Sequence, residues 1–211
     1  MKAAQSCAET VEQLIEVGRM AVDRGLVLAS GGNLSARLPG EQSFYITSGG
    51  AWLDRLTPTD FSQVDLAGTV IGGAEKPSSE WKLHQRTYQV RPDVNAVVHV
   101  HPQYAILVDV LDHPIRMFSL DHAYYVKAVG VTPYYPNGSD ELADTAAEQA
   151  RHHNCVLMSN HGCSTMGEDI GMAFRRAINL EEAAMATYRA LTVGDTTSTF
   201  PVAAYQQLHH A

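Results

Sequence analysis

The chain has 211 residues, of which 45% are hydrophobic and 18% charged, and its formal net charge is −8. This length can bury a full core and predicts one domain over residues 1–211, although residues 192–211 carry few signals. The negative charge argues against non-specific binding of nucleic acid, which needs a basic surface. No apolar run approaches the roughly 20 residues that span a bilayer, so no membrane partner is expected. A polar N-terminus and three cysteines without a Cys-x-x-Cys pair predict a cytoplasmic protein.

The first third of the chain predicts one helix followed by short strands and tight turns. Apolar residues recur every three or four positions over residues 9–24, which indicates an amphipathic helix. Residues 30–37 form a polar loop with two adjacent glycines. Such a loop can cradle an anion with its backbone N–H groups, but without context an ordinary tight turn is the simpler interpretation. Strands are expected over residues 44–47, 61–65 and 69–71, the last two as a hairpin.

A second helix is predicted to begin at Pro77-Ser78-Ser79-Glu80 and to end near residue 90, before a proline. Serine is a favourable N-cap, and an acidic residue in the first turn suits the helix dipole. The N-terminus of a helix also binds phosphate well. Ser78 and Ser79 are therefore candidates for capping, which is the commoner role, and for phosphate binding, and the two roles are compatible.

The most informative stretch covers residues 94–102, a valine-rich run that predicts a short buried strand. Side chains alternate along a strand, so His99 and His101 point to the same face. Together with His161, which follows another apolar run, they form a set of three imidazoles, and Glu80 would add a carboxylate. This set is typical of a catalytic zinc site with an open position. The chain has ten histidines, so an incidental pair of core histidines is the alternative that the pattern leaves open.

The second half of the chain alternates helices and strands. Helices are expected over residues 104–111, 139–153 and 169–191. Strands are expected over residues 115–120, 131–135, 155–158 and 164–166, whereas residues 121–129 are ambiguous. Helices interleaved with strands, and at least one hairpin, predict an α/β single-domain layered fold with a central, largely antiparallel sheet flanked by helices.

Five motifs taken together resemble the class II aldolase/adducin family, and within it the L-fuculose-1-phosphate aldolases. The resemblance covers nearly the whole chain up to about residue 191, with the motifs in the family's order and at similar spacing. The matching segments are Gly31-Gly32-Asn33-Leu34-Ser35, Thr47-Ser48-Gly49-Gly50, Pro77-Ser78-Ser79-Glu80-Trp81, Ala96-Val97-Val98-His99-Val100-His101 and Asn160-His161-Gly162.

The resemblance implies a zinc enzyme that cleaves a ketose 1-phosphate to dihydroxyacetone phosphate and an aldehyde through a metal-stabilised enediolate. His99, His101 and His161 would bind one Zn²⁺ per subunit, and Glu80 would be the acid/base carboxylate. Tyr124, or the adjacent Tyr125, would be a proton donor at the site of a neighbouring subunit. A homotetramer with intersubunit active sites is therefore expected. The phosphate of the substrate would be bound by Gly32, Asn33, Ser48, Gly49, Gly50, Ser78 and Ser79.

One motif departs from the family's pattern, and three alternatives share its fold. The second phosphate loop usually reads Thr-Pro-Ser/Thr-Gly, so Ser48 is expected to replace the missing hydroxyl. Ribulose-5-phosphate 4-epimerases tend to carry Asp where Glu80 stands and also near Tyr124. Sugar-acid decarboxylases often replace the paired serines, and the related dehydratases share the fold as well. Non-catalytic adducin-like domains lack the full set of histidines. Glu80, the intact Ser78-Ser79 pair and the three histidines favour the aldolase.

Overall fold

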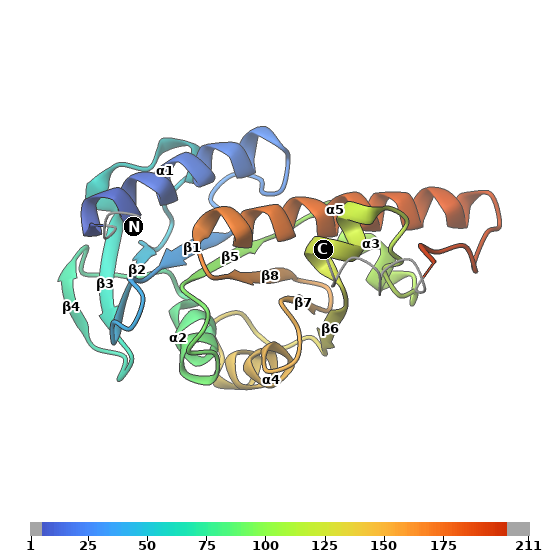
Figure 1. Ribbon diagram of the computed structural model, residues 1–211. Helices are drawn as coiled ribbons and strands as arrows, with labels where there is room; N and C mark the ends of the chain where they lie inside the picture. Colours follow the sequence, from blue (N-terminus) through green and yellow to red (C-terminus); the bar gives the residue numbers. More distant parts are fainter. Residues whose placement is uncertain (1–5, 202–211) are drawn as a thin grey trace, which may run out of the picture.

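Eight strands form one mixed sheet that separates two layers of helices (Figure 1). The computed structural model describes residues 6–201. Along the sheet the strand order is β4-β3-β2-β1-β5-β8-β7-β6, and every neighbouring pair is antiparallel except the parallel pair of β6 and β7. The expected α/β layered fold with a largely antiparallel sheet is confirmed.

The elements follow the predicted order with small shifts at their ends. The strands are β1 (Asn33–Ala36), β2 (Ser43–Thr47), β3 (Phe61–Asp65), β4 (Val70–Gly73), β5 (Ala96–Val100), β6 (Val129–Thr132), β7 (Cys155–Met158) and β8 (Gly162–Gly167). The helices are α1 (Cys7–Asp23), α2 (Trp81–Val90), α3 (Gln103–Val110), α4 (Asp140–Ala150) and α5 (Ile170–Thr192). Two 3-10 turns cover Leu53–Arg55 and Pro58–Asp60, and a π-helical turn covers His122–Val126.

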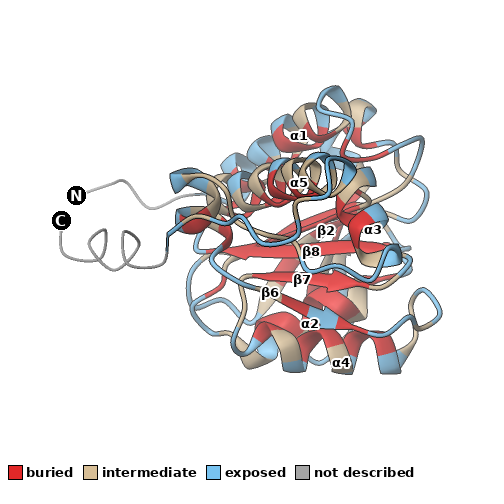
Figure 2. Cartoon of the chain, turned by 90° about the vertical axis from the view of Figure 1, so that its right-hand side faces the viewer, coloured by how far each residue is buried: buried red, intermediate tan, exposed pale blue. Residues whose placement is uncertain are grey.

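The helices bury their apolar sides against the two faces of the sheet. Helices α1, α3 and α5 pack on one face, and α2 and α4 pack on the other (Figures 1 and 2). Local sequence explains where the helices begin: Ser6 and Glu9 form a capping box at α1, and Asp169 caps α5. Within residues 6–201, no helix is both long enough and apolar enough to cross a membrane.

Strand β5 lies inside the sheet between β1 and β8, and all five of its residues are buried. A strand covered on both faces favours a continuous run of valines, which is what the sequence has there. His99 is paired with Asn33 of β1 on one side and with Ser164 of β8 on the other. The strand therefore holds its one imidazole in a rigid, dry position.

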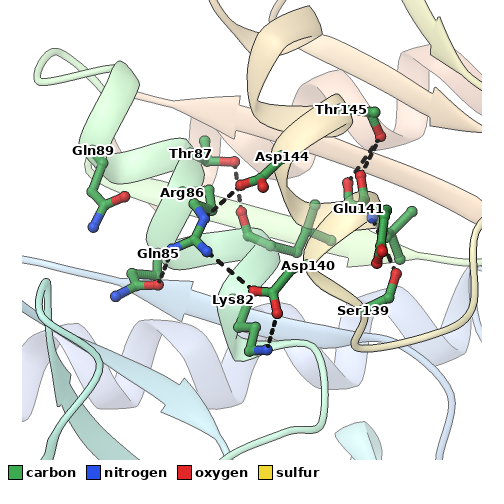
Figure 3. Close-up of polar contacts among 12 residues, drawn as sticks. Lys82, Gln85, Arg86, Thr87, Gln89, Ser139, Asp140, Glu141, Asp144 and Thr145 are labelled. Carbon is green, nitrogen blue, oxygen red and sulfur yellow. Dashed lines mark hydrogen bonds and ion pairs between the residues drawn. The ribbon is translucent and has the colours of Figure 1, made fainter.

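Helix α2 is tied to α4 by a cluster of ion pairs (Figure 3). Lys82 and Arg86 of α2 both contact the carboxylate of Asp140, at 2.9 and 3.1 Å, and Arg86 also contacts Asp144 at 2.7 Å. Single surface ion pairs contribute little, but a shared network restricts how two helices can slide past each other. These contacts fix α2, whose N-terminus carries Ser78, Ser79 and Glu80.

Two expectations about secondary structure were wrong. Residues 115–120 are not a strand, because their backbone bonds go to other partners: the Arg116 N–H donates to Thr187 of α5, and the Met117 carbonyl accepts from Phe200. The predicted loop over residues 30–37 contains strand β1, which pairs with both β2 and β5. Its polar residues suggested a turn, but they are buried among polar partners. The ambiguous residues 121–129 contain the π-helical turn.

Candidate metal centre

Four side chains from separate elements converge at one end of β5. Glu80, His99, His101 and His161 each offer a ligand atom, and these atoms all lie within 4.8 Å of one another. Glu80 directly precedes α2, His99 lies in β5, and His101 follows the end of that strand. The predicted orientation of the two strand histidines is confirmed, since their Nε2 atoms are 3.0 Å apart.

His161 reaches the cluster from the tight turn between β7 and β8. Asn160 takes a left-handed conformation with φ of 59°, which asparagine tolerates better than most residues. Gly162 then lets β8 pass close to β5, because a Cβ there would lie 2.5 Å from the Val100 carbonyl oxygen and 2.6 Å from the His101 ring. The Asn160-His161-Gly162 motif is therefore explained by backbone geometry around the ligand.

Hydrogen bonding fixes which ring nitrogen of His99 faces the cluster. The Nδ1 of His99 lies 3.0 Å from the carbonyl oxygen of Cys163, which can only accept, so Nδ1 carries the hydrogen. Nε2 is then the ring nitrogen of His99 that faces the cluster. Such a backbone partner on the second nitrogen is a usual feature of histidines that bind metals.

Glu80 is the buried carboxylate of the cluster. Its Oε2 accepts a hydrogen bond from the Nδ2 of Asn33 at 2.9 Å and lies 3.0 Å from the Nε2 of His99. Burial opposes the charge and by itself raises the pKa of Glu80. The charge of His99 and its hydrogen bond, followed by His161 and the Asn33 amide, outweigh burial and hold this pKa below its ordinary value. Glu80 is thus charged at neutral pH.

The donor set fits a divalent cation. The Oε1 of Glu80 is buried and lies 3.2 Å from the Nε2 of His161, yet it accepts no hydrogen bond. Burial lowers the pKa of His101 to about 3 and also lowers that of His161, so both rings are neutral and offer lone pairs. A buried carboxylate oxygen without a donor, facing neutral imidazoles, is satisfied by a cation. These residues therefore fit a mononuclear metal site.

A polar pocket of about 100 Å³ opens beside the cluster. Backbone pairing brings its two loops together: Ser48 bridges to Pro77, and the Ser78 N–H donates to the Thr47 carbonyl at 2.9 Å. Most of the predicted phosphate residues line the pocket, but Gly49 does not. The predicted residues in the lining are Gly32, Asn33, Ser48, Gly50, Ser78 and Ser79.

The pocket also has lining residues that the sequence analysis did not single out. These are Ala51 and Asn137, whereas Ser30 and Gly31, which also line the pocket, belong to the 30–37 loop that the sequence offered as a possible anion cradle. Asn137 comes from the loop before α4, where Gly138 has φ of 75° and a Cβ would lie 2.7 Å from the Ser79 carbonyl oxygen. The Asn-Gly pair in that loop is the one local signal that could have indicated such a close approach.

Tyr124 lies apart from this group. It belongs to the exposed π-helical turn, its side chain is 52% exposed, and its ring contacts that of Tyr125 edge-on at a centroid distance of 5.0 Å. Neither tyrosine lines the polar pocket. The structure thus places both tyrosines on the surface of the chain that carries them.

His84 is a buried histidine next to the cluster, and its titration gives a testable pH dependence. Burial, reinforced by the charge of His99, lowers its pKa to about 3, against an ordinary value of about 6.5. Between pH 3 and about 6.5 the His84 ring is protonated in the unfolded chain but neutral in the folded protein. The free energy of unfolding that the neutral ring contributes is therefore lost as the pH falls from about 6.5 towards 3. We expect the free energy of unfolding of the metal-free protein to fall by about 2 kcal/mol between pH 7 and pH 5 through this group.

Urea unfolding at several pH values measures this effect. The His84→Gln variant should lose that part of the pH dependence, whereas His152→Gln, at an exposed position on the protein surface, should keep it. An identical pH dependence in His84→Gln and the unaltered protein would contradict the assignment.

Three imidazoles and one carboxylate beside a polar pocket form a cluster that could hold one metal ion, as catalytic metal sites do. The family model of the class II aldolase and adducin N-terminal domain matches residues 12–188. An L-fuculose phosphate aldolase of Methanococcus maripaludis is 36% identical over 83% of this chain and 94% of its own length. A 3-oxo-tetronate 4-phosphate decarboxylase of Haemophilus influenzae is 34% identical over 82% and 84%. A solved L-fuculose 1-phosphate aldolase superposes with a TM-score of 0.88 at 29% identity, covering 97% of this chain and 96% of the other.

The chain belongs to the class II aldolase/adducin family. The class II aldolases are metal-dependent lyases, in agreement with the Glu-His-His-His cluster.

Proposed function

We propose that the protein is a zinc-dependent aldolase that cleaves a ketose 1-phosphate, L-fuculose 1-phosphate or a similar sugar, to dihydroxyacetone phosphate and an aldehyde. The observation that carries this proposal is the position of Ser78-Ser79-Glu80. Two hydroxyl residues of the polar pocket and the buried carboxylate of the cluster are consecutive at the start of α2. A substrate phosphate and the reacting carbons would therefore be held at a fixed separation.

The pocket suits a phosphate because it offers neutral donors at a helix N-terminus. Ser48, Ser78 and Ser79 supply hydroxyl groups, and the dipole of α2 favours an anion at its N-terminus. Gly32 has φ of 72°, and a Cβ there would lie 2.8 Å from the His99 carbonyl oxygen, so only glycine lets this loop approach the cluster. The backbone N–H of Gly49 donates to the carbonyl oxygen of Lys76, so it would bind the phosphate only after that hydrogen bond breaks.

Glu80 would move the proton in this reaction. A cation held by His99, His101 and His161 would polarise the substrate carbonyl and offset negative charge as the carbon–carbon bond breaks. Cleavage takes a proton from the hydroxyl of the carbon that leaves as aldehyde and returns one to the carbon of the phosphorylated fragment. Glu80 is charged, buried and beside the cluster, so it can serve as the acid/base group once substrate displaces its contacts.

The remaining features of the proposal concern the assembly. Tyr124, or the adjacent half-buried Tyr125, would donate a proton to the site of a neighbouring subunit, and the exposure of Tyr124 supports such a role. A homotetramer with intersubunit sites follows from that role. Both tyrosine roles, the one-domain organisation and a cytoplasmic location stay predictions.

A decarboxylase acting on a phosphorylated sugar acid is the second candidate. It is favoured by the relative from Haemophilus influenzae, whose named activity is a decarboxylation. Both reactions leave a carbanion next to a carbonyl, which a metal-linked site stabilises in the same way.

Metal removal combined with product analysis tests the proposal. We expect the zinc-loaded protein to release dihydroxyacetone phosphate from L-fuculose 1-phosphate or from a related ketose 1-phosphate. A chelator should abolish release and added zinc should restore it, because the cation is needed for bond cleavage. Carbon dioxide from a phosphorylated sugar acid, without aldol cleavage of any ketose 1-phosphate, would instead establish the second candidate.

A further inference from the structure

A chain of buried polar side chains runs from the metal cluster into the space between the sheet and α2. The Nδ2 of Asn33 contacts Glu80, and the Oδ1 of Asn33 contacts the Nε2 of His84. The Nδ1 of His84 lies 2.7 Å from the Oγ of Ser35, which lies 2.6 Å from the hydroxyl of Tyr88. All five side chains are buried, and His84 and Ser35 are fully buried.

Sequence spacing explains why these groups meet. Asn33 and Ser35 lie two positions apart on β1, so both point to the same face of the sheet. His84 and Tyr88 lie four positions apart on α2, so both point from the same face of the helix. The helix is held over this face by the ion pairs with α4, so the contacts are set by two rigid elements.

The charge of Glu80 fixes the direction of every hydrogen bond in the chain. A carboxylate can only accept, so the Asn33 amide must turn its Nδ2 towards Glu80 and its Oδ1 towards His84. The Nε2 of His84 must then carry the hydrogen, which leaves Nδ1 as an acceptor because the ring is neutral. Ser35 donates to that Nδ1, and the Tyr88 hydroxyl donates to Ser35. Each donor has one acceptor, and the opposite arrangement would set the Asn33 oxygen against the carboxylate.

We propose that His84 is a positioning residue for Glu80, which acts by locking the side-chain amide of Asn33 in the orientation that donates to the carboxylate. This inference rests on the proposed acid/base role of Glu80. Without the N–H of His84, the Asn33 amide loses the partner of its oxygen and is free to rotate. Glu80 then loses the charge-assisted hydrogen bond that holds its Oε2 beside the histidines.

Two substitutions of His84 separate positioning from packing. Glutamine can place an N–H near the position of Nε2, whereas leucine fills the space without a donor. Outer hydrogen-bond partners of metal sites typically contribute about 10–100-fold to activity. We therefore expect His84→Leu to lower kcat by about 10–100-fold and His84→Gln to recover most of the loss. KM for the ketose 1-phosphate should change much less than kcat, since the hydroxyl groups of the pocket are untouched and only the Asn33 amide moves. Thr87→Val is the matched control, because Thr87 is buried on α2 and its hydroxyl donates to the backbone carbonyl of Leu83.

Two readouts do not require turnover. The ¹⁵N chemical shifts of the His84 ring in the metal-free protein should show a neutral imidazole with its hydrogen on Nε2. Zinc affinity, measured by competition with a chromophoric chelator, should fall in His84→Leu more than in His84→Gln. If the protein cleaves no ketose phosphate, the proposed function fails, and these two readouts still decide the role of His84.

Three results would overturn the inference. They are a hydrogen on Nδ1 of His84, equal losses of kcat and zinc affinity in the leucine and glutamine variants, and a loss in Thr87→Val as large as that in His84→Leu.

Discussion

His99→Ala is expected to abolish both metal binding and activity. His99 is fully buried in β5, and its Nε2 lies within about 3 Å of both Glu80 and His101, so it stands at the centre of the donor set. Removing one of three imidazoles leaves too few protein ligands for a stable catalytic site. A cation that stabilises the transition state by several kcal/mol accounts for a loss of about 1,000-fold or more in kcat. Zinc content by elemental analysis and turnover of the ketose phosphate measure the two effects.

A second variant distinguishes the loss of a metal ligand from a loss of folding. Alanine at position 99 leaves a cavity in an interior strand, so part of the effect could be a loss of stability. His161→Ala removes a ligand from a turn instead, where the side chain is 11% exposed and less packing is lost. We expect the same loss of zinc and activity from it, with a smaller change in thermal unfolding. His113→Ala, on the exposed surface, should change neither. Normal zinc content in both His99→Ala and His161→Ala would exclude the cluster as the metal site.

Glu80→Gln is expected to keep zinc and lose most turnover. The three imidazoles remain, and the amide has nearly the shape of the carboxylate, so the site should stay assembled. The amide cannot accept a proton at neutral pH, and loss of a positioned acid/base group typically costs about 10²–10⁴-fold in kcat. Zinc content, kcat and KM, measured on the same preparation, separate loss of proton transfer from loss of metal.

Glu80→Asp is the matched variant, because it keeps the charge and shortens the side chain. It should retain more activity than the glutamine variant if the carboxylate transfers protons. A Glu80→Gln protein that turns over at a near-normal rate would exclude Glu80 as the acid/base group. A Glu80→Gln protein that has lost its zinc would show instead that the carboxylate is required to hold the metal.

Sequence reasoning worked best where one local pattern determined the structure. The valine run with His99 and His101 predicted a buried strand with two histidines on one face. Strand β5 is buried and ends at Val100, so it contains His99 alone, but His101 directly after it still turns its ring to the same side. The helices expected over residues 9–24 and 169–191 begin within two residues of the observed N-termini of α1 and α5, where Ser6 and Asp169 are the caps. The order of the motifs predicted the family, and the comparison with known proteins confirms it.

Sequence reasoning failed where distant partners determined the structure. Residues 33–36 looked like a loop because Asn33 and Ser35 are polar, but the buried imidazole and hydroxyl groups of α2 satisfy them inside a strand. Residues 115–120 looked like a strand, but their backbone groups are paired with α5 and with residue 200. His84 lies one helical turn after Glu80, and this i, i+4 spacing was the signal that could have indicated its role.

The sequence by itself determined the types of the candidate ligands, the strand that places His99 and His101 on one side, and the helix start at Ser78, Ser79 and Glu80. These features depend on side-chain alternation and on signals at the helix start, which act over a few residues, although Glu80 rather than a serine occupies the N-cap position of α2 and no side chain caps it. Only the tertiary structure decided that Glu80 meets the three histidines and that Asn33, 47 residues before it, donates to its carboxylate. Such contacts arise from strand pairing and helix packing between distant segments, and local sequence carries no direct record of them. The orientation of the Asn33 amide was likewise decided only by the tertiary structure, because the charge of Glu80 and the single N–H of His84 determine it together.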